Sequence, residues 1–90
     1  MSYRLILSAK AKEDLALFKR TGQQLVVKKI AKLLNELKEH PYTGTGKPEP
    51  LKYELSGCWS RRITHEHRMT YKVIDDKVIV EVLAFKGHYL

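Results

Sequence analysis

The pattern of a β-sheet is clearest in residues 67–85, which read HRMTYKVIDDKVIVEVLAF. Apolar and polar side chains alternate in the first part of this stretch, so that Met69, Tyr71 and Val73 share one face. The pair Asp75-Asp76 that follows is typical of a turn between two strands. The stretch therefore predicts two antiparallel strands, over residues 67–74 and 77–85.

Two helices and three further strands are expected before this stretch. Ser8 is a suitable N-cap for a first helix, in which Ala11 and Phe18 keep the helical spacing and Glu13 and Asp14 lie near the positive end of the dipole. A second helix is expected from Gln23 to Glu39, because the proline at 41 disfavours helical backbone in the residue before it. The remaining strands are expected over residues 3–7, 51–55 and 59–64, with a loop rich in glycine and proline over 42–50.

These elements predict an α+β fold, in which two N-terminal helices pack on one face of a mostly antiparallel β-sheet and leave the opposite face open. A length of 90 residues with 43% apolar residues predicts one domain over residues 1–90. The single cysteine, Cys58, cannot form an internal disulfide. No apolar run approaches the ~20 residues that span a bilayer, and the first residues lack the pattern of a signal peptide. We therefore expect a cytoplasmic protein that does not enter membranes.

The charge of the chain points to a polyanionic partner. Lys and Arg number 17 and Asp and Glu number 10, which gives a formal net charge of +7. An excess of this size on a short chain favours binding to nucleic acid, to an acidic protein or to an anionic membrane surface. Most of the excess lies in the first half of the sequence, which carries the predicted helices, where exposed lysines can also be a merely solvated face.

A stiff loop presents one carboxylate. Glu49 stands between Pro48 and Pro50, each of which fixes its own backbone φ near −65°. An acidic residue in a loop is most often an ordinary surface residue, but a rigidly presented carboxylate also meets the requirement for a general base.

Three arginines, Arg61, Arg62 and Arg68, lie within eight residues. Neighbouring strands would bring two of them, Arg62 and Arg68, together with Lys52 and Lys72 in a basic area. The planar guanidinium group matches the oxygens of a phosphate, so the cluster favours phosphate binding. The alternative is ordinary cross-strand pairing with the acidic residues Glu54, Glu66 or Glu81.

The histidines give a weaker signal. His65 and His67 could share a strand face near Cys58, but the spacing is not that of a zinc site, and no metal site is predicted. His88, close to the end of the chain, titrates in the range that acid catalysis at neutral pH requires.

Taken together, these segments resemble the YoeB/Txe family of bacterial toxins, within the RelE-type superfamily of messenger-RNA interferases. The resemblance rests on one long ordered string of residues and is looser in the helices. The carrying segments are GKPEPLK (46–52), LSGCWSRRIT (55–64), EHR (66–68), Tyr71 and His88-Tyr89.

The resemblance implies a fold similar to that of small microbial ribonucleases, and an endoribonuclease that cleaves messenger RNA in the ribosomal A site without a cofactor. Glu49 matches the general base of the family, Arg68 its phosphate-binding arginine and His88 its general acid. Lys52, Arg62 and Tyr89 match residues that bind the substrate. The resemblance also implies a cognate antitoxin of the YefM/Phd type, a ribosome partner and a homodimer.

The sequence departs from the family pattern at three positions, Gly87, Leu90 and Cys58, and the first two bear on the placement of His88. Three other interpretations remain open. The chain could be a ParE-like toxin that poisons DNA gyrase, a non-catalytic module that binds RNA or ribosomes, or a degenerate toxin that survives as a partner subunit.

Overall fold

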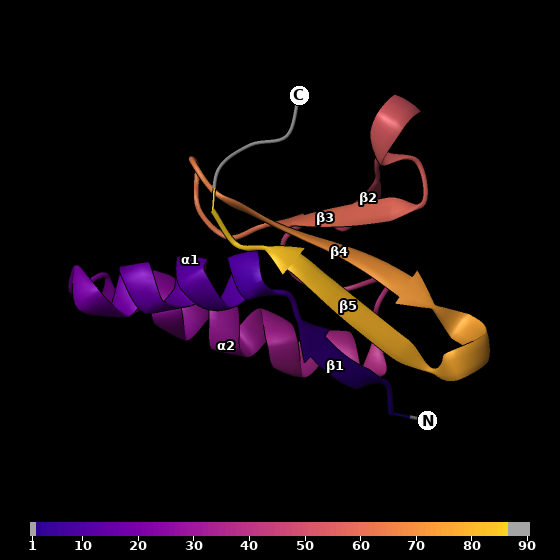
Figure 1. Cartoon of the computed structure of the whole chain (residues 1–90), viewed down its shortest axis with the longest axis horizontal. Coiled ribbons are helices and arrows are strands. Elements are labelled where there is room, and N and C mark those ends of the chain that lie inside the picture. Colours follow the sequence, from indigo (N-terminus) through magenta and orange to yellow (C-terminus); the bar gives the residue numbers. More distant parts are fainter. Residues whose placement is uncertain (1, 87–90) are drawn as a thin grey trace.

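The computed structural model describes residues 2–86. The elements are β1 (Arg4–Leu7), α1 (Ala9–Arg20), α2 (Gln24–Glu39), β2 (Glu49–Pro50), β3 (Cys58–Arg62), β4 (Arg68–Ile74) and β5 (Ile79–Ala84), with short 3-10 turns at Tyr53–Leu55 and Asp75–Lys77. The strands form one five-stranded sheet in the order β1-β5-β4-β3-β2 (Figure 1). β1 runs parallel to β5, and the other neighbouring strands pair antiparallel.

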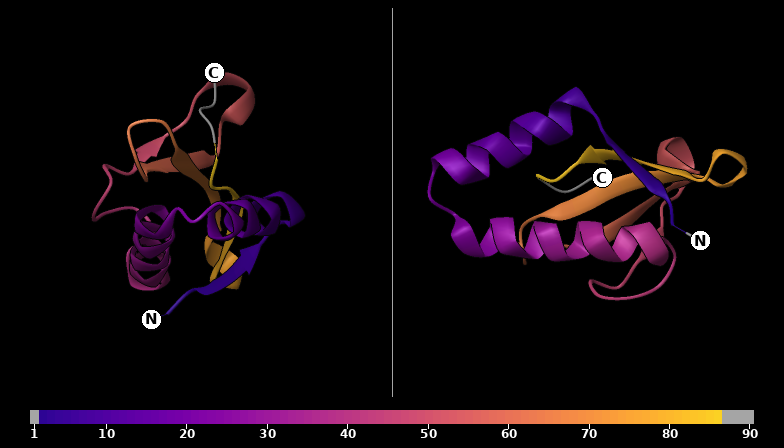
Figure 2. Two further views of the ribbon diagram at one scale, coloured as in Figure 1. Left: turned by 90° about the vertical axis from the view of Figure 1, so that its left-hand side faces the viewer. Right: turned by 90° about the horizontal axis from the view of Figure 1, so that it is seen from below.

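The two helices lie side by side on one side of the sheet, and the views in Figure 2 leave the other side of β3 and β4 uncovered by helix. The predicted fold class, with two N-terminal helices on one face of a mostly antiparallel sheet, is confirmed. No helix within residues 2–86 is long and apolar enough to cross a membrane.

The N-terminal helix begins where the sequence places its cap. The Ser8 hydroxyl oxygen accepts a hydrogen bond from the Ala11 backbone N–H at 3.0 Å, which satisfies one of the free N–H groups of the first turn. The same hydroxyl donates to the Leu83 carbonyl at 2.8 Å, so the cap also ties α1 to β5.

The core lies between the helices and the covered face of the sheet. Met69 and Tyr71 of β4 and Val80 and Val82 of β5 alternate with residues of the other face and are fully buried. The helices contribute a buried stripe at helical spacing, formed by Ala11, Phe18, Ile30, Leu33 and Leu37. Burying each large apolar side chain stabilises the fold by about 1.5–3 kcal/mol.

The strand predicted over residues 51–55 is wrong. The edge strand is only Glu49–Pro50, after which the Leu51 N–H donates one more bond to the Cys58 carbonyl at 2.9 Å. The chain then leaves the sheet in the turn Tyr53–Leu55, where Tyr53 has a φ of +58° and is 90% exposed. The alternation of apolar residues suggested a strand, but Pro50 has no N–H for a ladder and the chain must reverse before β3.

Candidate functional site

Strand register brings the predicted acidic and basic residues onto one face of the sheet. Glu49 lies opposite Ser60 across β2 and β3, and Arg62 lies opposite Arg68 across β3 and β4. Successive side chains of a strand point to opposite faces. Since Arg61 and its partner Met69 are fully buried on the helix side, Arg62 and Arg68 belong to the open face, together with Glu49.

The carboxylate and one guanidinium of this face form a loose ion pair. Arg68 Nη1 lies 3.8 Å from Glu49 Oε1, which is beyond hydrogen-bond distance. The side chains remain 53% exposed for Glu49 and 21% exposed for Arg68. A ligand that approaches the open face can therefore reach the carboxylate and the guanidinium at the same time.

Two arginines directly opposite one another repel, and this costs stability. Arg62 and Arg68 occupy such a pair of positions, and their planar N–H groups match phosphate oxygens. An anion between or above them would relieve the repulsion. The arrangement can therefore bind a phosphodiester beside a carboxylate that accepts a proton.

The third arginine of the cluster does not join this face, and its grouping with a phosphate site is wrong. The Arg61 side chain is fully buried. Its guanidinium donates hydrogen bonds to three backbone carbonyls of the segment after α2, those of His40, Thr43 and Thr45. It also donates to the Tyr71 hydroxyl at 3.1 Å and forms an ion pair with Glu36 at 3.3 Å. Arg61 therefore holds the segment that connects α2 to β2, and so to Glu49.

A carboxylate of α2 supports the same segment. Glu36 Oε1 accepts the Thr45 backbone N–H at 2.8 Å. Partial burial on its own would raise the pKa of Glu36, but the Thr45 hydrogen bond and the charges of Arg61 and Lys32 together lower it. Glu36 therefore stays ionised beside the buried guanidinium.

A glycine lets this segment approach β3 closely. The Gly46 carbonyl accepts the Arg62 N–H at 2.8 Å, and Gly46 has a φ of +87°. A Cβ at this position would lie 2.8 Å from the Arg62 carbonyl oxygen, which is closer than real contacts allow. Only glycine combines this backbone conformation with this approach.

The two lysines of the predicted basic area are not part of the Arg62–Arg68 cross-strand pair. Lys72 stands opposite Glu81 across β4 and β5, one of the acidic partners considered for the cluster. Lys52 is exposed in the segment that follows β2. The predicted histidine and tyrosine of the site, His88 and Tyr89, lie outside the described residues.

A residue close to the end of β5 was missed as a functional candidate. The sequence suggested that Asp14 lies near the positive end of the α1 dipole. In the structure it lies beyond the first turn of α1 and is only 7% exposed. Its Oδ2 accepts the backbone N–H groups of Phe85 at 3.0 Å and Lys86 at 3.2 Å. The carboxylate thus fixes the backbone where β5 ends. These two backbone partners lie more than 70 residues away in the sequence, so they leave no local signal, unlike the i,i+4 pair that Asp14 forms with Lys10.

The two histidines near the β3–β4 turn have different surroundings. The His67 ring packs edge-on against Phe18 at 5.2 Å between centroids, and His65 is exposed. Within residues 2–86, no group of three or more His, Cys, Asp or Glu side chains is placed to hold a metal ion.

A tyrosine–aspartate cluster ties the start of the chain to the turn after β4. Tyr3 and Tyr42 donate to the two oxygens of Asp75 at 2.7 and 2.6 Å. The Tyr42 hydrogen bond, followed by that of Tyr3, lowers the pKa of Asp75. The same bond to Asp75, with desolvation and the negative charge, raises the pKa of Tyr42 to about 12. The cluster joins residues far apart in the sequence and includes neither Glu49 nor Arg68.

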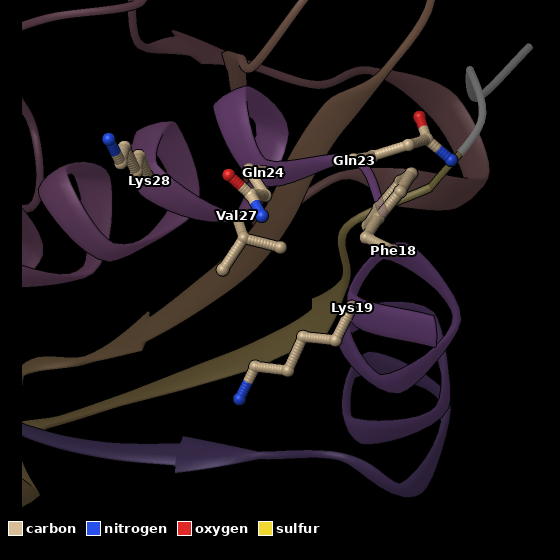
Figure 3. A pocket seen from close by; sticks show the side chains of 6 residues that line it. All are labelled: Phe18, Lys19, Gln23, Gln24, Val27 and Lys28. Atoms are coloured by element: carbon tan, nitrogen blue, oxygen red, sulfur yellow. The ribbon is translucent and has the colours of Figure 1, made fainter. Parts of the chain in front are cut away.

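A separate pocket lies where α1 meets α2 (Figure 3). It has a volume of about 270 Å³ and none of the predicted site residues lines it. Its lining residues are Phe18, Lys19, Gln23, Gln24, Val27 and Lys28.

Comparison with known proteins gives one consistent family. Residues 7–89 match the model of the YoeB-like toxin of bacterial type II toxin–antitoxin systems. The chain is 44% identical over 86 residues to the toxin YoeB of Escherichia coli K12, which covers 96% of this chain and 99% of the relative.

Solved structures agree with this result. The YoeB/ParE toxin from Agrobacterium tumefaciens superposes with a TM-score of 0.89 at 40% identity, covering 96% of this chain and 99% of that chain. The Staphylococcus aureus YoeB dimer gives a TM-score of 0.85, and the YoeB–YefM complex of that organism gives 0.83. Both are 38% identical and cover 99% of this chain and 100% of the matched chain. The chain therefore belongs to the YoeB-like toxins of bacterial type II toxin–antitoxin systems.

Proposed function

We propose that this toxin is an endoribonuclease that cleaves messenger RNA in the ribosomal A site and so inhibits translation. The observation that carries the proposal is the exposed Glu49 carboxylate, 3.8 Å from the Arg68 guanidinium, with Arg62 opposite Arg68 on the same open face. This face offers a proton acceptor and two phosphate-binding groups side by side.

The proposed reaction uses the nucleophile that RNA itself carries. Glu49 accepts the proton of the ribose 2′-hydroxyl, and the 2′-oxygen attacks the adjacent phosphorus. The bond from phosphorus to the 5′-oxygen breaks, and His88 donates a proton to that leaving oxygen. The products are a 2′,3′-cyclic phosphate and a 5′-hydroxyl end. Arg68 stabilises the charge that develops on the phosphoryl oxygens.

Three further residues are proposed to bind the substrate. Arg62 contacts the same phosphate as Arg68, Lys52 contacts a neighbouring phosphate, and Tyr89 contacts the RNA near His88. The pairing of Arg62 with Arg68 supports the first of these roles, since both guanidinium groups lie on the face of Glu49.

The proposed partners follow from the relatives. The Staphylococcus aureus relatives form a dimer and a complex with YefM. We propose that this toxin likewise forms a homodimer and binds a YefM/Phd-type antitoxin. The net charge of +7 favours an acidic segment of that antitoxin.

The test is to add the purified toxin to a reconstituted translation reaction and to map the ends of the messenger RNA. Glu49→Gln and His88→Ala should each lower the cleavage rate by about 10²–10⁴-fold, because each removes one proton-transfer group. Glu54→Gln, which neutralises an exposed carboxylate five residues from Glu49, should cleave like the wild type.

Arg68→Ala should cleave far more slowly while binding of the antitoxin changes less. An equal loss of both would show that Arg68 is structural. A wild-type toxin that binds ribosomes and leaves the message intact would overturn the enzyme proposal. Inhibition of gyrase-dependent supercoiling would instead favour the ParE-like alternative.

A further inference from the structure

The turn after β2 displays an aromatic ring that the fold does not use. Tyr53 is 90% exposed, more than any other large hydrophobic residue within residues 2–86. In the same part of the chain, its side chain has no hydrogen-bond or aromatic partner. Its φ of +58° is unfavourable for an aromatic residue. Neither burial nor a side-chain contact within residues 2–86 therefore explains why a tyrosine stands here.

The turn lies on the side of the sheet that carries the proposed active site. Figures 1 and 2 show the short helical turn after β2 standing off β3, on the side opposite α1 and α2. Tyr53 follows Glu49 by four residues, which span at most about 14 Å of extended chain. The backbone of the turn that carries Tyr53 is thus at most a few nucleotides from that of Glu49.

The charge beside the ring suits a nucleic-acid strand. Lys52 directly precedes Tyr53 and is exposed. Arg68 and Arg62 lie on the open face beyond β2. Proteins that bind single-stranded RNA combine cations along the backbone with exposed aromatic rings on which the bases stack.

We propose that Tyr53 is a stacking platform for one unpaired base of the bound RNA strand, while Lys52 neutralises the neighbouring phosphate. This inference rests on the proposed function and deepens it, because it names a subsite that holds the strand away from the broken bond. Stacking uses the face of the base, so the subsite accepts every base and adds affinity without strict sequence preference.

Two variants separate the ring from the backbone. Tyr53→Phe keeps the ring, and Tyr53→Asn removes it while supplying a residue that tolerates left-handed backbone. Because the ring has no partner within residues 2–86, Tyr53→Phe should unfold at the same denaturant concentration as the wild type. Tyr53→Asn should unfold at the same or a slightly higher concentration, since asparagine tolerates the φ of +58° better.

The probe is a fluorescein-labelled, single-stranded 2′-O-methyl RNA, whose blocked 2′-oxygens cannot attack phosphorus. Tyr53→Asn should weaken binding by about 5- to 150-fold, the range that corresponds to the loss of one stacked base. Tyr53→Phe should bind like the wild type. Lys52→Ala should reduce the dependence of binding on salt, which Tyr53→Asn should leave unchanged.

A second series of probes replaces one base at a time by an abasic residue. For one abasic position, the wild type should bind the abasic probe as weakly as Tyr53→Asn binds the intact strand. Tyr53→Asn should bind that abasic probe and the intact strand equally well. This non-additivity identifies the base that contacts the ring.

The proposal is overturned if Tyr53→Asn binds the intact RNA as tightly as the wild type, or if every abasic probe binds the wild type equally well. It is also overturned if Tyr53→Asn loses only antitoxin binding, since the ring is then a protein contact. Binding is measured with a probe that cannot be cleaved, so the two proposals can fail separately. If binding of the probe depends on the base but messenger RNA on ribosomes stays intact, only the proposed enzyme activity is contradicted. Cleavage with unchanged RNA binding by Tyr53→Asn would count against the stacking subsite alone.

Discussion

Replacing Arg61 by methionine removes the side chain that holds the α2–β2 segment. Methionine is long and unbranched but donates no hydrogen bond, so it can fill much of the same space without satisfying its neighbours. The variant leaves the Thr43 carbonyl, which Arg61 contacts at 2.7 Å, and the Glu36 carboxylate, which it contacts at 3.3 Å, without this donor. Because the Arg61 side chain is fully buried, water does not readily reach these acceptors to replace the lost hydrogen bonds.

The expected loss of stability is large. Removing one partner of a buried ion pair costs about 3–5 kcal/mol. The Glu36 side chain is 23% exposed and regains some solvation, so we expect the lower end, about 3 kcal/mol. Each kcal/mol lowers the melting temperature of a domain of this size by about 4–8 °C, which gives a decrease of about 12–24 °C.

The adjacent arginine provides a matched control. Arg62→Met makes the same chemical change on the same strand, but on the open face opposite Arg68, where it removes a repulsion. Its free energy of unfolding should stay within about 0.5 kcal/mol of the wild type. Urea unfolding followed by circular dichroism measures both variants. The Thr45 backbone N–H donates a hydrogen bond to Glu36, and its hydrogen exchange should accelerate only in Arg61→Met. If the two variants differ by less than about 1 kcal/mol, Arg61 does not anchor the segment.

Three other changes test separate contacts. Asp14→Ala leaves the N–H of Phe85 without its acceptor, so urea unfolding should show a loss of about 1–3 kcal/mol and exchange of that amide should accelerate; unchanged exchange would contradict the clamp. Asp75→Asn concerns a carboxylate whose pKa hydrogen bonds hold below the ordinary value of 3.8. Such a group stabilises the fold above pH 3.8 and less as the pH falls through its folded-state pKa, so melting temperatures from pH 2 to 6 should fall less steeply in the variant. An unchanged slope would count against this linkage. Gly46→Ala should destabilise more than Gly22→Ala in thermal unfolding, because both have positive φ but only the first meets a neighbouring backbone; equal losses would refute the steric argument.

Local patterns in the sequence carried much of the fold. The helical spacing of Ile30, Leu33 and Leu37 and the cap at Ser8 depend on residues within a few positions of each other, and both are present in the structure. The alternation of Met69 and Tyr71 fixed the covered face of the sheet in the same way.

The misassigned residues depend on distant partners. Arg61 and Arg62 are neighbours in sequence and of the same type, and strand alternation puts them on opposite faces. Only the approach of the α2–β2 segment makes one of them a buried anchor. Asp14 reads as an ordinary helix residue because its acceptor role depends on the amide of Phe85.

Tyr53 shows the opposite failure, in which a local pattern is overridden. The alternation in residues 51–55 suggested a strand, but Pro50 ends the ladder and the chain turns out of the sheet. The same turn exposes the Tyr53 ring. The proposed stacking residue therefore lies in the segment where the local pattern wrongly predicted a strand.

The parallel pairing of β1 with β5 joins the first strand within residues 2–86 to the last one there. Contacts of such long separation form late, because the loop between them must close before the contacts contribute. During synthesis, β1 with Leu5 and both helices are made before β5, which contributes Val80 and Val82 to the core. While it is being made, the polypeptide cannot assemble the sheet that carries Glu49 and Arg68 in full. The open face that holds Glu49 and Arg68 is therefore backed by a whole sheet only once β5 has been synthesised and has paired with both β1 and β4.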